Sequence, residues 1–143
     1  MLEKKVYYFL KIITLFAFSG QKDFSIKEVA RRTGISIKVL EQVLLALKNK
    51  GILGSKRGPG GGYRLIKDVS NMSIMDVLSL TGKEIRILPA LAEPGRNIID
   101  NVMVDILGAV EGELKELLSR KLIKDLVAGM KARATENGLT YII

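Results

Sequence analysis

Residues Lys56–Tyr63 read KRGPGGGY, and this glycine-rich stretch decides which class of fold the chain has. Glycine-rich loops cradle phosphates in many enzymes, but no Lys-Ser or Lys-Thr pair follows these glycines, as a Walker loop requires. A dinucleotide-binding fingerprint fits Gly58 and Gly60 but meets Tyr63 where it needs a third glycine, and a predicted strand follows instead of a helix. The stretch therefore predicts the tip of a β-hairpin.

The residues on both sides of the glycines have the composition of two short strands, 52–57 and 63–66. Glycines let a backbone approach a phosphate or enter a narrow groove, and Pro59 restricts the tip. Arginine is well suited to a narrow minor groove. The hairpin therefore predicts a DNA-binding wing, with Lys56, Arg57, Gly58, Gly60 and Arg64 as its candidate contacts.

Two short helices are predicted before the hairpin. Ser25-Ile-Lys-Glu28 is a capping box that opens the first, which ends at Gly34; Ser36 caps the second, which ends at Gly51. Two helices joined by a short glycine turn form either a helix-turn-helix or an ordinary helical hairpin. The wing that follows favours the helix-turn-helix, in which the second helix buries Leu40, Val43, Leu44 and Leu47.

The opposite face of this second helix carries polar residues that suit base recognition. Lys38, Glu41 and Gln42 lie at positions i, i+3 and i+4, so they share one face, and Ser36 stands at the helix start. Glutamate can accept from cytosine N4, and glutamine can pair with adenine. These four residues are the predicted major-groove contacts.

The segment Gly34–Leu65, GISIKVLEQVLLALKNKGILGSKRGPGGGYRL, resembles the Rrf2 family of bacterial winged-helix transcription regulators. Its RGPGGGY string is close to the signature of that family, and a looser resemblance covers nearly the whole chain. The resemblance implies that Glu41 and Gln42 reach base edges and that Arg57 enters the minor groove. Lys38 and Val39 differ from the residues expected in the best-known iron–sulfur members, so no operator sequence is implied.

The chain has no cysteine and no histidine, which removes disulfides, Ser–His and Cys–His nucleophiles and the usual zinc and iron–sulfur ligands. In the iron–sulfur members, a loop matching residues 83–96 and the start of the next helix supply three cysteines to a [2Fe–2S] cluster. We therefore expect a cluster-free member with no metal, no cofactor and no catalysis. The resemblance leaves two kinds of signal open, a partner protein such as a metabolic enzyme or a small-molecule effector.

The second half of the chain predicts a dimerisation unit. A short helix opens at Ser73, a loop follows at 83–96 with a possible strand at 85–88, and a long amphipathic helix starts at Asn97. A last helix is expected at about 120–130, followed by a tail. The long helix either packs on its own domain or pairs with a second copy, and we expect both; the candidate dimer contacts are Ile99, Val102, Ile106, Val110, Leu114 and Leu117.

The positive charge lies in the first half of the chain. Residues 1–67 hold 14 Lys and Arg against 4 Asp and Glu, a net +10, whereas residues 68–143 hold 9 against 11, a net −2. The first twenty residues imitate a secretory signal, but Lys11 interrupts the apolar run and the helical spacing of its apolar residues favours a buried first helix. We expect a cytoplasmic protein without a membrane partner.

The sequence thus predicts a mainly α fold with a small β-wing, divided into a winged helix-turn-helix domain (1–82), the loop (83–96), and a dimerisation helix, final helix and tail (97–143). The expected function is that of a homodimeric, sequence-specific regulator that binds duplex DNA and acts as a repressor. The alternative is a module that binds a protein or RNA through the same basic surface.

Overall fold

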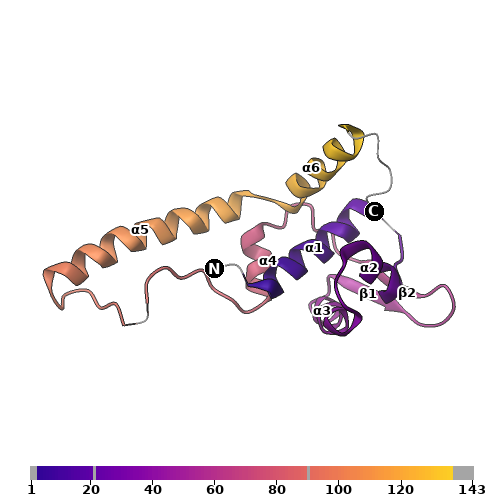
Figure 1. Cartoon of the computed structure of the whole chain (residues 1–143), viewed down its shortest axis with the longest axis horizontal. Coiled ribbons are helices and arrows are strands. Elements are labelled where there is room, and N and C mark those ends of the chain that lie inside the picture. Colours follow the sequence, from indigo (N-terminus) through magenta and orange to yellow (C-terminus); the bar gives the residue numbers. More distant parts are fainter. Residues whose placement is uncertain (1–2, 21, 90, 137–143) are drawn as a thin grey trace.

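The computed structural model describes residues 3–20, 22–89 and 91–136. Within these ranges the chain forms six helices and one two-stranded antiparallel sheet (Figure 1), which confirms the mainly α fold with a small β-wing. In chain order the elements are α1 (Lys4–Ser19), α2 (Ile26–Thr33), α3 (Ile37–Asn49), β1 (Leu53–Lys56), β2 (Gly62–Leu65), α4 (Ile74–Leu80), α5 (Ile98–Arg120) and α6 (Ile123–Glu136).

Helix α1 is the central element of the core. It contacts α2, α4, α6 and β2, and the side chains of Phe9, Ile12, Ile13 and Phe16 are at most 1% exposed. The first helix is therefore buried, as its apolar spacing predicted. Among the described helices, none combines the length and apolar character that a membrane span requires.

The helix-turn-helix begins and ends at the predicted residues. Ser25 Oγ accepts the Glu28 N–H at 3.2 Å, but in the described part of the chain Glu28 does not accept the Ser25 N–H in return, so only half of the predicted capping box forms. Gly34 ends α2 with φ +73°, and Ser36 Oγ accepts the Val39 N–H at 3.4 Å to open α3. Gly51 follows α3 with φ +74°, a conformation that favours glycine.

The first strand of the wing is shorter than predicted, and a segment outside the hairpin pairs with its second strand. Strand β1 covers 53–56 instead of 52–57, and β2 starts at Gly62, with Leu53 opposite Leu65 and Lys56 opposite Gly62. Phe24 and Tyr63 exchange two backbone hydrogen bonds, of 2.9 and 2.8 Å, so the segment before α2 lies along the outer side of β2. This pairing fixes the wing to the helix-turn-helix.

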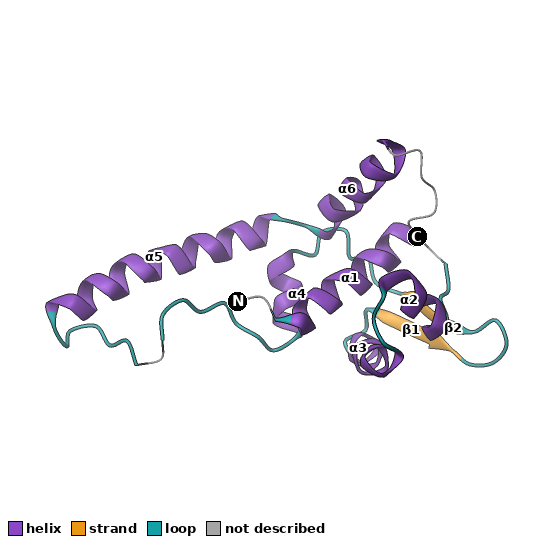
Figure 2. Cartoon of the chain, viewed as in Figure 1, coloured by secondary structure: helices purple, strands orange, loops and turns teal. Residues whose placement is uncertain are grey.

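Helix α4 opens with a full capping box between Ser73 and Asp76. The possible strand at 85–88 does not form, because the N–H groups of Ile87 and Leu88 donate to the carboxylate of Glu111 in α5 instead of to a neighbouring strand. Figure 2 shows the described residues between α4 and α5, 83–89 and 91–96, as loop.

The predicted final helix was placed too early in the chain. Residues Lys121 and Leu122 leave the helical conformation, and Leu122 pairs with Ser73 in an isolated bridge. Asp125 accepts the Leu122 N–H at 2.9 Å, and α6 then runs from Ile123 to Glu136, past the predicted end at 130. Helices α5 and α6 are therefore separate elements; the predicted tail lies outside the described residues.

Candidate nucleic-acid interface

Helix α3 has the two faces that were predicted for a recognition helix. Leu40, Val43, Leu44 and Leu47 are at most 4% exposed and pack into the core. On the opposite face, the side chains of Lys38, Glu41 and Gln42 are exposed, as is Ser36 at the helix start. The structure thus brings all four predicted residues together on one solvent-facing surface.

The tip of the wing is exposed and its shape depends on glycine. Lys56, Arg57, Gly58 and Gly60 all face solvent, and Gly58 and Gly60 have φ of +94° and +73°. A Cβ added to Gly61 would stand 2.2 Å from the carbonyl oxygen of Lys56. The tip is therefore too tight for a side chain at position 61, and Lys56 and Arg57 are exposed beside it.

Arg64 is placed differently from the other predicted wing cations. Its guanidinium donates to both carboxylate oxygens of Asp23, each at 2.7 Å, while about half of its side chain stays exposed. This hydrogen bond lowers the pKa of Asp23 and raises that of Arg64. Arg64 therefore ties the wing to the segment before α2, a role that the alternation of the strand could not indicate.

Lys5 and Tyr8 of α1, which the sequence did not place near the predicted recognition helix, lie beside α3. Together with Gln42 of α3 they line a cavity of about 320 Å³ between the two helices. The residues are separated by more than thirty positions, so no local spacing links them.

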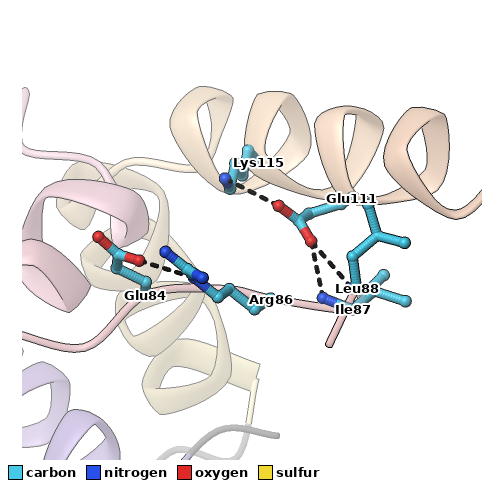
Figure 3. Close-up of polar contacts among 6 residues, drawn as sticks. All are labelled: Glu84, Arg86, Ile87, Leu88, Glu111 and Lys115. Carbon is cyan, nitrogen blue, oxygen red and sulfur yellow. Dashed lines mark hydrogen bonds and ion pairs between the residues drawn. The ribbon is translucent and has the colours of Figure 1, made fainter. Parts of the chain in front are cut away.

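A carboxylate of α5 binds the first part of the loop that follows α4 (Figure 3). Glu111 accepts the N–H of Ile87 at 2.8 Å and that of Leu88 at 3.3 Å, and Lys115 donates to it at 3.1 Å. These hydrogen bonds, the one from the Ile87 N–H first, lower the pKa of Glu111 to about 2. A partly buried, ionised side chain therefore holds the loop that lies between wing and long helix.

Three helices, an exposed polar face on the third and a glycine-rich hairpin directly after it define a winged helix-turn-helix protein. The chain belongs to the Rrf2 family: the sequence model of that family, described as an iron-dependent transcriptional regulator, matches residues 2–129.

Similar proteins bear the names of transcription regulators. The HTH-type transcriptional regulator IscR of Escherichia coli O1:K1 is 40% identical over 58 residues, which are 41% of this chain and 36% of that protein. The chain thus matches little more than a third of the length of this relative.

Solved structures match over most of the chain. CymR, the global cysteine regulator of B. subtilis, superimposes with a TM-score of 0.75 at 24% identity, covering 90% of this chain and 96% of that one. The oxidised form of Staphylococcus aureus CymR gives a TM-score of 0.70 at 26% identity, covering 89% and 95%. A T. potens IscR gives 0.69 at 21% identity, covering 91% and 88%.

The residues of this chain do not fit the iron that the family description implies. Iron–sulfur clusters are held by thiolates, with imidazole as a partial replacement, and the sequence contains neither cysteine nor histidine. In the ranges the structure describes, no group of three or more carboxylates is placed to hold a metal ion. The carboxylate of Glu111, which binds the loop after α4, already accepts hydrogen bonds from two backbone N–H groups and from Lys115.

Proposed function

We propose that the protein is a sequence-specific DNA-binding transcription regulator that acts as a homodimer and represses its targets. The observation that carries the proposal is the polar face of α3. Lys38, Glu41 and Gln42 are exposed there while the leucines behind them are buried, so the helix can enter a major groove without exposing its apolar face. Membership of a family of transcription regulators supports the same function.

The wing supplies the second contact of the proposed interface. Lys56 and Arg57 are exposed beside a tip built from glycine, so a phosphate or the floor of a minor groove can come close to the backbone. Arg64 is bound to Asp23, so its proposed contact is with a phosphate from the exposed half of its side chain. We assign base recognition to α3 and positioning to the wing.

The proposed dimer forms through α5. No residue of this helix is buried in the single chain, and Ile99, Val102, Ile106, Val110 and Leu117 are each more than 40% exposed. Leu114 alone of the predicted stripe is partly buried, against a small cluster around α4. Contiguous apolar surface of this kind marks a protein interface. A two-fold dimer would present two α3 helices to an operator with inverted half-sites.

Selection of bound duplexes from a random pool tests this function. We expect the wild-type protein to enrich an inverted repeat whose half-site centres lie one helical turn, about 10–10.5 bp, or a multiple of it apart. The double variant Glu41→Ala/Gln42→Ala should lose that enrichment, whereas the matched variant Lys48→Ala/Asn49→Ala at the end of the same helix should keep it. Enrichment of no sequence, or tighter binding of RNA than of duplex DNA, would favour the interaction-module alternative.

A further inference from the structure

A cavity of about 380 Å³ lies between the helix-turn-helix and the C-terminal helix. Its walls come from α1, α2, α4 and α6, and most of its surface is apolar. Ligand sites in proteins begin at about this size and combine apolar walls with a few polar groups. The apolar wall is formed by Tyr7, Leu10, Leu15, Ile74, Leu126 and Met130.

Two unsatisfied polar atoms mark this cavity. Across the described residues, the buried side-chain atoms without a hydrogen-bond partner are Thr14 Oγ1 and Arg32 Nε, and both residues line the same cavity. Thr14 is only 7% exposed, so water reaches its hydroxyl poorly. A buried polar group without a partner costs free energy, and native structures seldom leave two of them together unless something else bonds to them.

The charge around the cavity selects the kind of ligand. The described residues that line it include two cations, Lys11 and Arg32, and no carboxylate. The Lys11 amine donates to the Thr33 carbonyl and lies 5.7 Å from the centroid of the Tyr7 ring, which holds it at the wall. The Arg32 guanidinium lies 5.1 Å from the centroid of the Phe24 ring. Lys11 uses one of its three N–H donors for Thr33, and Arg32 Nε has no partner, so both cations keep N–H donors for an anion.

We propose that this cavity binds a small monocarboxylate with an apolar chain or ring. The carboxylate accepts from Lys11, Thr14 and Arg32, and the apolar part lies against α4 and α6. Because the walls come from both the helix-turn-helix and α6, occupancy joins these parts of the chain, and the ligand can act as an effector. Only the effector role rests on the proposed DNA-binding function; binding of the carboxylate to the cavity does not depend on it.

Three eight-carbon probes test the proposal by titration calorimetry on the full chain. Octanoate carries the proposed charge, 1-octanol is its neutral counterpart and octylammonium reverses the sign. We expect octanoate to bind, 1-octanol to bind at least about tenfold more weakly, since a hydrogen bond to a charged group is worth that much, and octylammonium more weakly still. Equal affinities, or no octanoate binding, would overturn the proposal.

Matched variants show whether the named groups make the site. Lys11→Met and Thr14→Val should each weaken octanoate binding, by about tenfold for the lysine, while the controls Lys4→Met and Thr135→Val leave it unchanged. Thr14→Val also removes an unsatisfied hydroxyl from the free protein, so its melting temperature should be equal to or above that of the wild type. Unchanged octanoate affinity in Thr14→Val, or equal loss in the controls, would contradict the assignment.

A second copy of the chain is the rival occupant, because α5 exposes an apolar stripe that could lie on the same wall. Sedimentation of Lys11→Met and Thr14→Val separates the two cases. Self-association like that of the wild type, with weakened octanoate binding, supports the ligand site. Weakened self-association without any octanoate binding to the wild type would assign the cavity to a protein interface and overturn the proposal.

Titration of the selected operator with and without octanoate tests the effector step. A change in operator affinity that Thr14→Val abolishes supports it, and an unchanged affinity rejects it. Octanoate binding by a protein that binds no duplex DNA would reject the proposed function and leave the ligand site standing. Binding of duplex DNA by a protein that does not bind octanoate would reject the ligand site and leave the proposed DNA-binding function standing.

Discussion

Glu41 and Gln42 are the residues on which sequence recognition is expected to depend. Both side chains are exposed on α3, and a side chain that reads a base pair discriminates by about 1–3 kcal/mol. We expect Glu41→Ala and Gln42→Ala each to relax base preference at particular operator positions by this amount. Competition binding with single-base operator variants measures it.

Lys56 provides the control for this prediction. A lysine that contacts only phosphate carries no sequence information, so Lys56→Ala should weaken binding to all sequences alike. If Glu41→Ala behaved in the same way, with a uniform loss and an unchanged base preference, the assignment of base recognition to α3 would be wrong.

Glu111 leads to a prediction about pH. The bonds from Ile87, Leu88 and Lys115 lower its pKa to about 2, below its usual value of 4.5. Because the folded-state pKa is depressed, the stabilisation is present above pH 4.5 and is lost as the pH falls towards 2. We expect Glu111→Gln to melt below the wild type at pH 7, with the difference narrowing between pH 4.5 and 2.

Glu113→Gln is the matched control, since Glu113 is an exposed glutamate on the same helix. Its melting temperature should follow that of the wild type throughout. A Glu111→Gln deficit that stayed constant down to pH 2 would mean that the substitution acts through packing and not through loss of the ionised acceptor.

At the residue scale, the sequence identified which side chains are exposed on α3 but not which residues form hydrogen bonds with Arg64 and Glu111. The face of Lys38, Glu41 and Gln42 follows from helical spacing alone, and the structure shows it exposed. The pairing of Arg64 with Asp23 joins residues 41 positions apart, and no local pattern encodes such a distance. The role of Glu111 as acceptor for a loop 24 positions earlier was hidden for the same reason.

At the element scale, the wing depends on Gly62. This residue has φ +149°, and a Cβ added to it would stand 2.4 Å from the carbonyl oxygen of Phe24, the residue that pairs with Tyr63. Gly62→Ala should therefore separate the wing from the segment before α2 and destabilise the protein by at least about 1 kcal/mol. Chemical denaturation measures the change.

Gly129→Ala is a control that we expect to change the stability in the opposite direction. Gly129 lies inside α6, and an added Cβ would meet nothing within 4 Å. Alanine is favoured over glycine in a helix interior by about 1 kcal/mol, so this variant should be more stable than the wild type. Equal stabilities of the two glycine variants would argue against a special role for Gly62.

The elements that the sequence predicted well are those with their own boundary signals. Serine caps open α2, α3 and α4 at the predicted residues, and Gly34 and Gly51 end α2 and α3 within two residues of prediction. The start of α6 was missed because Leu122 pairs with Ser73, a tertiary contact that interrupts an otherwise helical sequence. The possible strand at 85–88 failed because a side chain, not a strand, satisfies its N–H groups.

At the scale of the whole molecule, the exposed apolar residues of α5 lead us to expect that two chains associate through this helix. Val102 is 48% exposed and Ile106 59% exposed on a helix without any buried residue. Val102→Glu and Ile106→Glu would each place an unpaired carboxylate in the proposed interface, which costs several kcal/mol. Sedimentation equilibrium should show a monomer for both variants.

Ser119→Glu adds the same charge to the exposed opposite side of α5 and should sediment as the wild type. An intact dimer in both Val102→Glu and Ile106→Glu would move the interface away from this helix. Loss of the dimer in all three variants would indicate a general effect of negative charge on the helix.

The charge distribution of the whole molecule leads to a prediction about salt. Residues 1–67 carry a net charge of +10 and residues 68–143 a net charge of −2, so we expect the first half to face the phosphates. Each phosphate that a lysine or arginine neutralises releases counterions. For about 6–10 contacts per dimer, log affinity should fall with log salt at a slope of roughly −5 to −9.

Single substitutions show which half of the chain produces this slope. Lys56→Ala removes one expected contact from each protomer, so the slope should become shallower by about 0.9 per contact. Lys124→Ala removes the same charge from an exposed position on α6 and should leave the slope unchanged. Fluorescence anisotropy of a labelled duplex between low and physiological salt measures all three proteins. Because Lys56→Ala and Lys124→Ala lower the net charge equally, equal slopes in the two variants would show that total charge, and not a placed wing cation, governs binding.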